Sequence, residues 1–348
     1  CYNGFTSLLV PLQQGQLKLP FRLDFDRFED DYPSIHNQRF YGFSKMTFAN
    51  GFNDPSLIRD KLAGDLFRRG GVPVARVALV RVHVDFGEGP VYFGLYSMIE
   101  DPSDRMLQAQ FGSGGGNLYK PDGDLGASWQ VCVEEDFVKK TNKGSGFGDV
   151  CDAIAALHAD RSDAVVWRAA LEKKFDVQGF LRWLAINQTM ENSDSYPCQP
   201  HNYYLYGVPG EAGRLDWFPW DMNEALAHYP GYCPSSLAEM GSILLDEVGS
   251  DRPLIRILLD DPEYRQVYLD ELQAALDGAF ELEWVFSRID ALHSLIAPWV
   301  VGESGEKAPY TLLTRDADFE ESIEGDNPLA LKPHATKRAE AVRQALGL

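Results

Sequence analysis

The sequence contains few cysteines, lacks a long apolar run, and has too few basic residues to balance its acidic ones. It has 32 Lys and Arg against 52 Asp and Glu, which gives a formal net charge of -20. This deficit argues against binding nucleic acid, or docking on an anionic membrane, through a general basic surface. No apolar stretch approaches the roughly 20 residues of a membrane-spanning helix. We therefore expect neither a nucleic-acid partner nor a membrane span.

The cysteines are too scattered for a zinc ribbon, because no CxxC pair occurs among Cys1, Cys132, Cys151, Cys198 and Cys233. Two disulfides and a free Cys1 would suit an exported or surface-associated protein. The preferred pairs are then Cys132–Cys151 and Cys198–Cys233. Free thiols throughout, in a cytosolic protein, are the alternative. If Cys1 is a mature N-terminus, it would also be a lipoprotein attachment point.

The first hundred residues predict an antiparallel sheet with one helix. Alternating apolar and polar residues, or β-branched and aromatic runs, indicate strands at 18–28, 43–50, 74–86 and 91–100. A helix is expected over 53–71, with Asp54 as N-cap, Pro55 at the first helical position and Gly70-Gly71 as the stop.

The rest of the chain predicts mainly helices, at 104–112, 149–159, 163–175, 176–190, 253–261, 262–278 and 282–300. A glycine-rich loop at 112–124 surrounds a short strand, and two further strands are expected at 202–208 and 215–220. The sequence therefore predicts an α+β protein with a small β-rich lobe over 1–101 and a helical lobe over 102–348.

Several catalytic templates are absent, because the sequence contains no GxSxG, HExxH or GxxxxGK[ST] motif and its seven His are dispersed. What remains is Asp194 after a helix, Asn202 at the start of a strand, and Asp221 after a strand–turn–strand unit. These side chains can converge on one point. One aspartate would accept the proton of an attacking hydroxyl, while Asn202 and Asp221 would hold Mg²⁺ against phosphates.

These stretches also carry a family resemblance. The segments "NSDSY…HNYYLY", "WFPWDMN", "NDPSLIRDKLAGDLFRRGGVPVARV", "YFGLYSMIED" and "GNLYK" resemble the CotH family of spore-coat-type atypical protein kinases, from about Lys18 to about Val300. The resemblance implies a protein-kinase-like two-lobed fold that binds ATP and Mg²⁺, with Mn²⁺ as an alternative ion. It implies that Asp194 is the catalytic aspartate, and that Asn202 and Asp221 bind the metal.

The sequence departs from the family pattern between the first two of these residues. Seven residues separate Asp194 from Asn202, where the family has four. The loop must therefore bulge to return Asn202 to the site, and a Cys198–Cys233 bridge would hold that bulge. The role of Asn202 depends on this bulge.

The resemblance also implies contacts to the nucleotide. Lys45 lies where a kinase carries its phosphate-binding lysine, and Lys18 is a rival. Arg59 lies where a kinase has the glutamate that orients this lysine, although it can instead pair with local carboxylates. Met98 and Glu100 resemble the hinge that touches adenine. Lys120, after the glycine-rich loop, is a further phosphate candidate.

The resulting prediction is an ATP-dependent Ser/Thr protein kinase that acts on basic protein substrates, because an acidic surface attracts Lys/Arg-rich peptides. Two alternatives remain. A kinase-like fold can transfer AMP or activate a carboxylate, and the protein can be a non-catalytic component of a coat or surface layer. The stretched Asp–Asn spacing and the missing glutamate favour this last alternative mildly.

Overall fold

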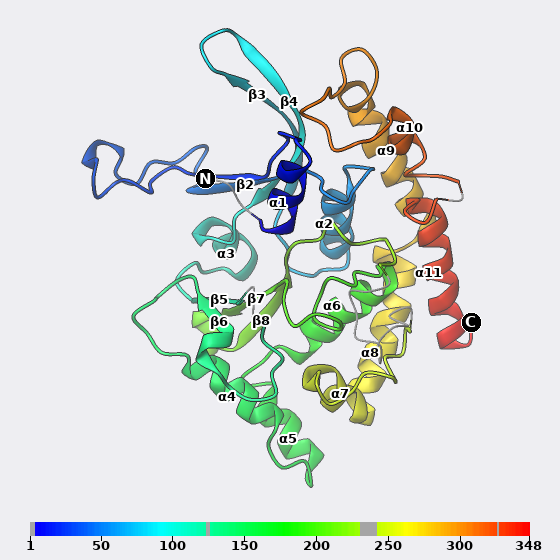
Figure 1. The fold of residues 1–348 in the computed structure, drawn as a ribbon. Helices are drawn as coiled ribbons and strands as arrows, with labels where there is room; N and C mark the ends of the chain where they lie inside the picture. Colours follow the sequence, from blue (N-terminus) through cyan, green and yellow to red (C-terminus); the bar gives the residue numbers. More distant parts are fainter. Residues whose placement is uncertain (1–3, 123–125, 230–241, 326) are drawn as a thin grey trace. The chain divides into compact units, whose positions relative to one another are not determined.

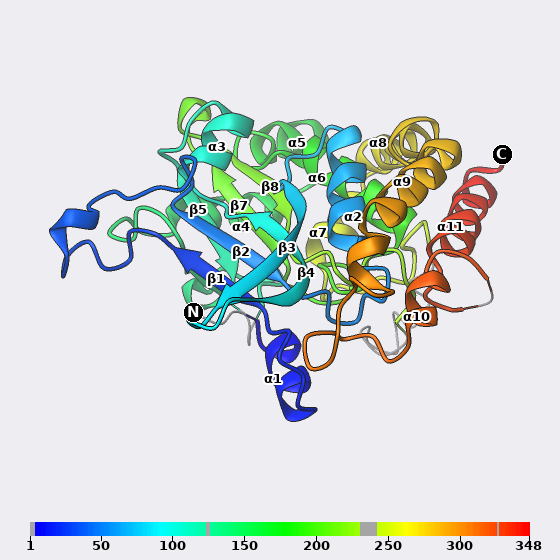
Figure 2. The same ribbon diagram turned by 90° about the horizontal axis from the view of Figure 1, so that it is seen from above.

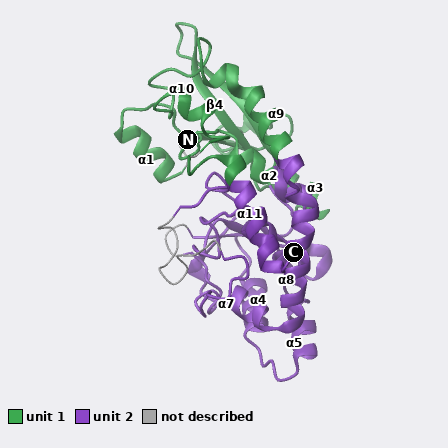
Figure 3. Ribbon diagram, turned by 90° about the vertical axis from the view of Figure 1, so that its right-hand side faces the viewer, with its two compact units in different colours: residues 1–64, 75–114, 286–333 green, residues 65–74, 115–285, 334–348 purple. Residues whose placement is uncertain are grey.

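The computed structural model describes residues 4–122, 126–229, 242–325 and 327–348. Two compact units make up the chain, and each is assembled from separate segments (Figure 3). Unit 1 comprises 1–64, 75–114 and 286–333, and unit 2 comprises 65–74, 115–285 and 334–348. The predicted boundary between a nucleotide-binding lobe over 1–101 and a helical lobe over 102–348 stays a prediction.

Unit 1 contains a four-stranded antiparallel sheet with the order β1-β2-β4-β3 (Figure 1). Its strands are β1 (Phe21–Asp24), β2 (Lys45–Ala49), β3 (Val77–Asp85) and β4 (Pro90–Glu100). Met46, Phe48 and Tyr96 are buried together on this sheet, and Phe21 stacks on Phe48 with ring centroids 4.5 Å apart. The predicted antiparallel sheet is confirmed.

The helices of unit 1 include two that the sequence did not predict. Helices α3 (Asp104–Phe111) and α9 (Leu282–Val300) were expected, and α9 begins in unit 2 and continues into unit 1. Helices α1 (Thr6–Gln13) and α10 (Asp316–Glu320) were not.

The N-terminus of helix α2 differs from the prediction. The helix spans Arg59–Arg69, so Asp54 is not its N-cap and Pro55 is not its first residue. Leu57 has a φ of 56°, in the left-handed region, which interrupts any helix through this segment. Asp54 instead organises a turn, because its carboxylate accepts hydrogen bonds from the backbone N–H groups of Ser56 and Arg59 at 3.0 and 2.9 Å.

Unit 2 contains a second antiparallel sheet with the order β6-β5-β7-β8. Its strands are β5 (Asn117–Pro121), β6 (Phe137–Lys139), β7 (Tyr203–Gly207) and β8 (Leu215–Pro219). Its helices are α4 (Gly148–Leu157), α5 (Ala164–Leu171), α6 (Val177–Met190), α7 (Pro253–Asp260) and α8 (Pro262–Ala274), with a π-helical turn at Ala275–Ala279. The α+β class is therefore confirmed in both units.

Helix α6 is the central helix of unit 2. It runs beside α8 (Figures 1 and 2), and all its residues from Trp183 to Met190 are buried. An aromatic cluster joins α6 to the sheet, because Trp217 of β8 lies 5.0 Å from Phe180 and stacks on Tyr203 of β7 at 3.7 Å between ring centroids. This packing fixes the N-terminal half of α6 against strands β7 and β8.

One further helix, α11 (Leu331–Leu346), begins in unit 1 and continues into unit 2. None of the helices in the described part of the chain is both long and apolar enough to cross a bilayer.

Candidate active site

The candidate site lies at one end of the β7–β8 hairpin. The register pairs Tyr203 with Pro219, so the start of β7 and the end of β8 meet at the same edge. The backbone N–H of Trp220 donates to the carbonyl of Asn202 at 3.0 Å and extends this pairing by one step. Asn202 and Asp221 are therefore brought together by ordinary antiparallel geometry.

Asp194 is held in place by two side chains of the same loop. His201 Nε2 donates to Asp194 Oδ1 at 2.8 Å, while Asn202 Nδ2 donates to Asp194 Oδ2 at 3.0 Å and to its backbone oxygen at 2.9 Å. Both carboxylate oxygens are thus engaged, which fixes the orientation of the group. The sequence reasoning missed His201, although its position next to Asn202 was the available signal.

The inserted residues of the loop form a compact turn. The backbone N–H groups of Cys198 and Gln199 donate to the carbonyl of Ser195 at 3.0 and 2.7 Å, and Ala127 N–H donates to the carbonyl of Pro200 at 2.7 Å. The loop therefore bulges and returns Asn202 to Asp194, as the longer spacing required. Asn202 has a φ of 58°, a conformation that asparagine adopts more readily than most residues.

Unit 2 contains disulfide-bonded cysteines. Cys132 and Cys151 are bonded, which confirms the first preferred pair. Cys198, inside the bulge, is also disulfide-bonded. Its predicted partner, Cys233, lies outside the described residues.

Asp221 is within electrostatic reach of three charged or titratable groups. Desolvation by the surrounding protein raises its pKa, and the negative charge of Asp194 adds to this rise, while Lys120 and His201 oppose it. The residue retains solvent exposure, which limits the size of the shift. Two carboxylates that disfavour each other's charge are a suitable environment for a cation.

Lys120, a weaker candidate in the sequence, has an electrostatic effect on Asp221. It lies on β5, which pairs with β7, and its Nζ lies 6.0 Å from the ring centroid of Tyr204. Its charge lowers the pKa of Asp221, so the two groups are within electrostatic reach of each other in unit 2.

The other predicted nucleotide contacts lie in unit 1. Lys18 is fully buried, and its Nζ lies 2.6 Å from Glu306 Oε1. Lys45 is partly exposed, with its Nζ 3.7 Å from Asp24 Oδ2. This difference favours Lys45 over Lys18 as the phosphate-binding candidate of this unit.

Arg59 is also fully buried. Its Nε lies 3.2 Å from Asp54 Oδ1, and its Nη2 donates to the carbonyl of Leu329 at 2.5 Å. Arg59 therefore pairs with a local carboxylate. Met98 and Glu100 are half-buried on β4, and Glu100 Oε2 accepts the backbone N–H of Arg76 at 3.1 Å.

The donor atoms of Asn202 and Asp221 are of the type that suits a magnesium ion. Carboxylate and amide oxygens are the ligands that Mg²⁺ prefers, and the Asn202 amide nitrogen faces Asp194, which leaves its oxygen as the atom able to ligate. Within the described ranges, no group of three or more His, Cys, Asp or Glu side chains is arranged to hold a metal. The fit rests on the donor chemistry of Asn202 and Asp221, one amide and one carboxylate.

Comparison with known proteins shows which protein family the sequence matches. The sequence profile of the CotH kinase protein family matches residues 13–342. Inner spore coat protein H of Bacillus subtilis is 25% identical over 289 residues, which cover 80% of this chain and 75% of that protein.

Two fungal proteins are also similar. Invasin CotH3 of Rhizopus delemar is 22% identical over 76% of this chain, and invasin CotH2 of the same organism is 26% identical over 49%. The matches span 45% and 30% of those two longer proteins.

Among solved structures, a Shewanella oneidensis HipA–HipB toxin–antitoxin complex with operator DNA is 14% identical, with a TM-score of 0.36. The match covers 87% of this chain and 58% of that one.

Proposed function

Because this chain belongs to the CotH kinase protein family, we propose that it transfers the γ-phosphate of ATP to Ser or Thr hydroxyls of protein substrates, with Mg²⁺ as the metal. One observation carries the proposal. Asp194 is held by His201 and Asn202, and Asp221 lies close enough for its pKa to respond to the Asp194 charge.

Asp194 would act on the attacking hydroxyl. The oxygen of the substrate hydroxyl would bond to the γ-phosphorus while the bond between the γ-phosphorus and the β–γ bridging oxygen breaks. The proton of the hydroxyl would pass to Asp194, and ADP would leave with the bridging oxygen. The hydrogen bonds from His201 and Asn202 keep the carboxylate oriented for this transfer.

Asn202 and Asp221 would hold the metal, which neutralises phosphate charge when it is bound. Lys120, whose charge acts on Asp221, would add positive charge for the phosphates within unit 2. Contacts of Lys45, Met98 and Glu100 with the nucleotide remain predictions.

A coat or surface location is part of the proposal. The names of the spore coat and invasin relatives support it, and so does the Cys132–Cys151 disulfide, because disulfides persist in oxidising compartments.

The test is transfer of label from [γ-³²P]ATP to a Lys/Arg-rich peptide that contains Ser and Thr. We expect the wild type to be labelled in the presence of Mg²⁺. Asp194→Ala and Asp221→Ala should each lower the rate by about 100-fold or more, with a nearly unchanged melting temperature. Asp30→Ala, at an exposed carboxylate of unit 1, is the control and should keep full activity.

Full activity in both site variants would contradict the assignment. Label from [α-³²P]ATP in the product would instead indicate AMP transfer. No thermal shift at millimolar ATP and Mg²⁺ would favour a non-catalytic coat component.

A further inference from the structure

Glu191 occupies an unusual position at the base of the loop that carries Asp194. It directly follows Met190, the last residue of α6, and its side chain is almost fully buried. Its φ is 59°, in the left-handed region that few residues other than glycine adopt. A buried carboxylate on such a backbone persists only where surrounding contacts hold it.

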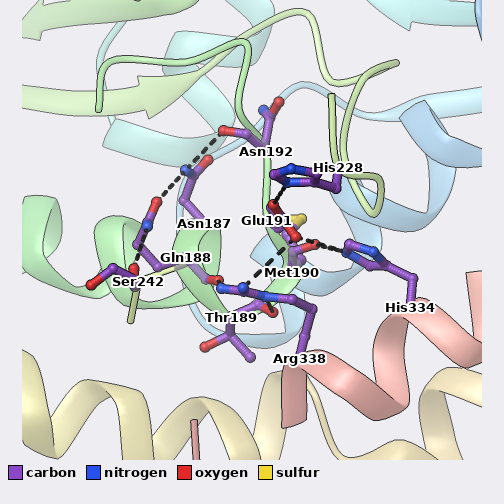
Figure 4. Close-up of polar contacts among 10 residues, drawn as sticks. All are labelled: Asn187, Gln188, Thr189, Met190, Glu191, Asn192, His228, Ser242, His334 and Arg338. Atoms are coloured by element: carbon purple, nitrogen blue, oxygen red, sulfur yellow. Dashed lines mark hydrogen bonds and ion pairs between the residues drawn. The ribbon is translucent and has the colours of Figure 1, made fainter. Parts of the chain in front are cut away.

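The first set of contacts joins Glu191 to the segment that follows Asp221. The backbone N–H of Leu226 donates to the Glu191 carbonyl at 3.0 Å, and Asn192 and Ala225 form an isolated antiparallel bridge. His228 Nδ1 lies 2.6 Å from Glu191 Oε1 (Figure 4). Backbone and side chain together therefore tie residues 191–192 to residues 225–228.

The second set joins Glu191 to α11. His334 Nε2 and Arg338 Nη1 lie 3.6 and 3.7 Å from Glu191 Oε2 (Figure 4). The same two side chains also donate to the final carbonyls of α6: Arg338 to Gln188 and Thr189, and His334 to Met190 at 3.1 Å. The last carbonyls of a helix lack partners within it, so α11 caps the C-terminus of α6.

The charges in this cluster depend on one another. Burial lowers the pKa of the Arg338 guanidinium, and the charge of Glu191 opposes that effect. A buried cation without its carboxylate is costly, so removing the charge of Glu191 would loosen α11 as well as the segment that contains His228.

From these contacts we propose that Glu191 is a positioning residue, which fixes the segment after Asp221 to the base of the Asp194 loop. Glu191 precedes Asp194 by three residues, and its backbone partner Leu226 follows Asp221 by five. The segments that carry both predicted working aspartates are therefore tethered through one buried residue, Glu191. The catalytic part of this inference rests on the proposed function.

The test compares Glu191→Gln, Arg338→Ala and Arg343→Ala with the wild type. Gln keeps the shape and one acceptor for His228 but removes the charge. Arg343 lies on the same helix and is exposed, so Arg343→Ala is the matched control for Arg338→Ala. The measurements are kcat, KM for ATP, the Mg²⁺ concentration for half-maximal activity, and amide hydrogen exchange over 222–229.

For Glu191→Gln and Arg338→Ala, we expect kcat to fall by about 10- to 100-fold, because small misplacements of reacting groups cost this much. The Mg²⁺ requirement should rise, KM for ATP should change less than about twofold, and exchange over 222–229 should be faster. Arg343→Ala should match the wild type in every measurement. A general loss of stability would instead speed exchange across the whole chain.

The outcome distinguishes this inference from the proposed function. If the wild type shows no phosphoryl transfer, the proposed function fails, while hydrogen exchange and Mn²⁺ affinity, measured by the relaxation of water protons, still test the tether. Unchanged exchange over 222–229 and unchanged Mn²⁺ affinity in Glu191→Gln would overturn it. Unchanged kcat in a variant with faster local exchange would overturn the catalytic part alone.

Discussion

At the scale of single residues, the two candidate metal ligands share a backbone conformation. Asn202 and Asp221 have φ angles of 58° and 57°, on either side of the hairpin edge. Non-glycine residues in this region are uncommon, and they persist where the surroundings over-determine them. Here the surroundings are the Trp220–Asn202 backbone hydrogen bond and the contacts of Asn202 with Asp194.

Lys18 provides a prediction about stability at this scale. Lys18→Met should lower the free energy of unfolding by about 3–5 kcal/mol, because it leaves the buried Glu306 carboxylate without its cation. Among the described residues, Glu306 Oε1 would keep the hydrogen bond from the backbone N–H of Leu95, at 2.7 Å. Urea unfolding measures the change.

Lys45→Met is the matched control, because its ion pair is partly exposed and 3.7 Å long. It should change stability by less than about 1 kcal/mol. A larger loss from Lys45→Met than from Lys18→Met would contradict the structural role of Lys18.

The sequence was enough to predict those residues of the candidate site whose side chains suit phosphoryl transfer and metal binding. Asp194, Asn202 and Asp221 stand at the ends of predicted elements, so their convergence could be inferred. Glu191, His334 and Arg338 could not be found in this way, because pairing over more than 140 positions leaves no local pattern.

At the scale of elements, local pattern predicted the strands well and the helix ends less well. Runs of β-branched and aromatic residues identified β3 and β4, and the exposure of β3 alternates along most of its length. The start of α2 was misplaced because Asp54 and Pro55 satisfy the usual rules of a helix start, while the backbone of Leu57 adopts a left-handed turn. Helix α11 was missed because its buried face combines small apolar residues, Ala335, Ala339 and Val342, with the polar His334 and Arg338, so no strong apolar stripe marks it.

The contact between β8 and the start of α6 predicts a pH dependence. Burial, and then the nearby Asp176, raise the pKa of Asp216 to about 7, against the opposing charge of Arg214. The folded protein thus binds this proton more tightly than the unfolded chain does. The resulting stabilisation is fully present below pH 3.8 and is lost as the pH rises through about 7.

Asp216→Asn should therefore gain stability relative to the wild type as the pH rises from about 4 to 8, by a few kcal/mol at most. Urea unfolding of both proteins at each pH measures the difference. A difference that stays constant between the two pH values would contradict the shifted pKa.

At the scale of the whole molecule, the net charge of -20 predicts how substrate encounter depends on salt. A Lys/Arg-rich substrate peptide should show a KM that rises several-fold as salt increases from about 0.01 to 0.15 M, because the Debye length falls from about 30 to 8 Å. A neutral Ser-containing peptide is the control and should change little. Equal salt dependence for both peptides would show that charge does not select the substrate.

The β7–β8 hairpin also has a practical consequence for engineering. Its turn, at 208–214, lies at the opposite end of the two strands from Asn202 and Asp221, and Pro209, Gly210, Glu211 and Ala212 are exposed. Extra residues there extend into solvent without changing the strand register, and exposed turns tolerate such additions. A fluorescent reporter or an affinity tag inserted after Gly210 would therefore provide a handle on the protein that leaves its candidate active site intact.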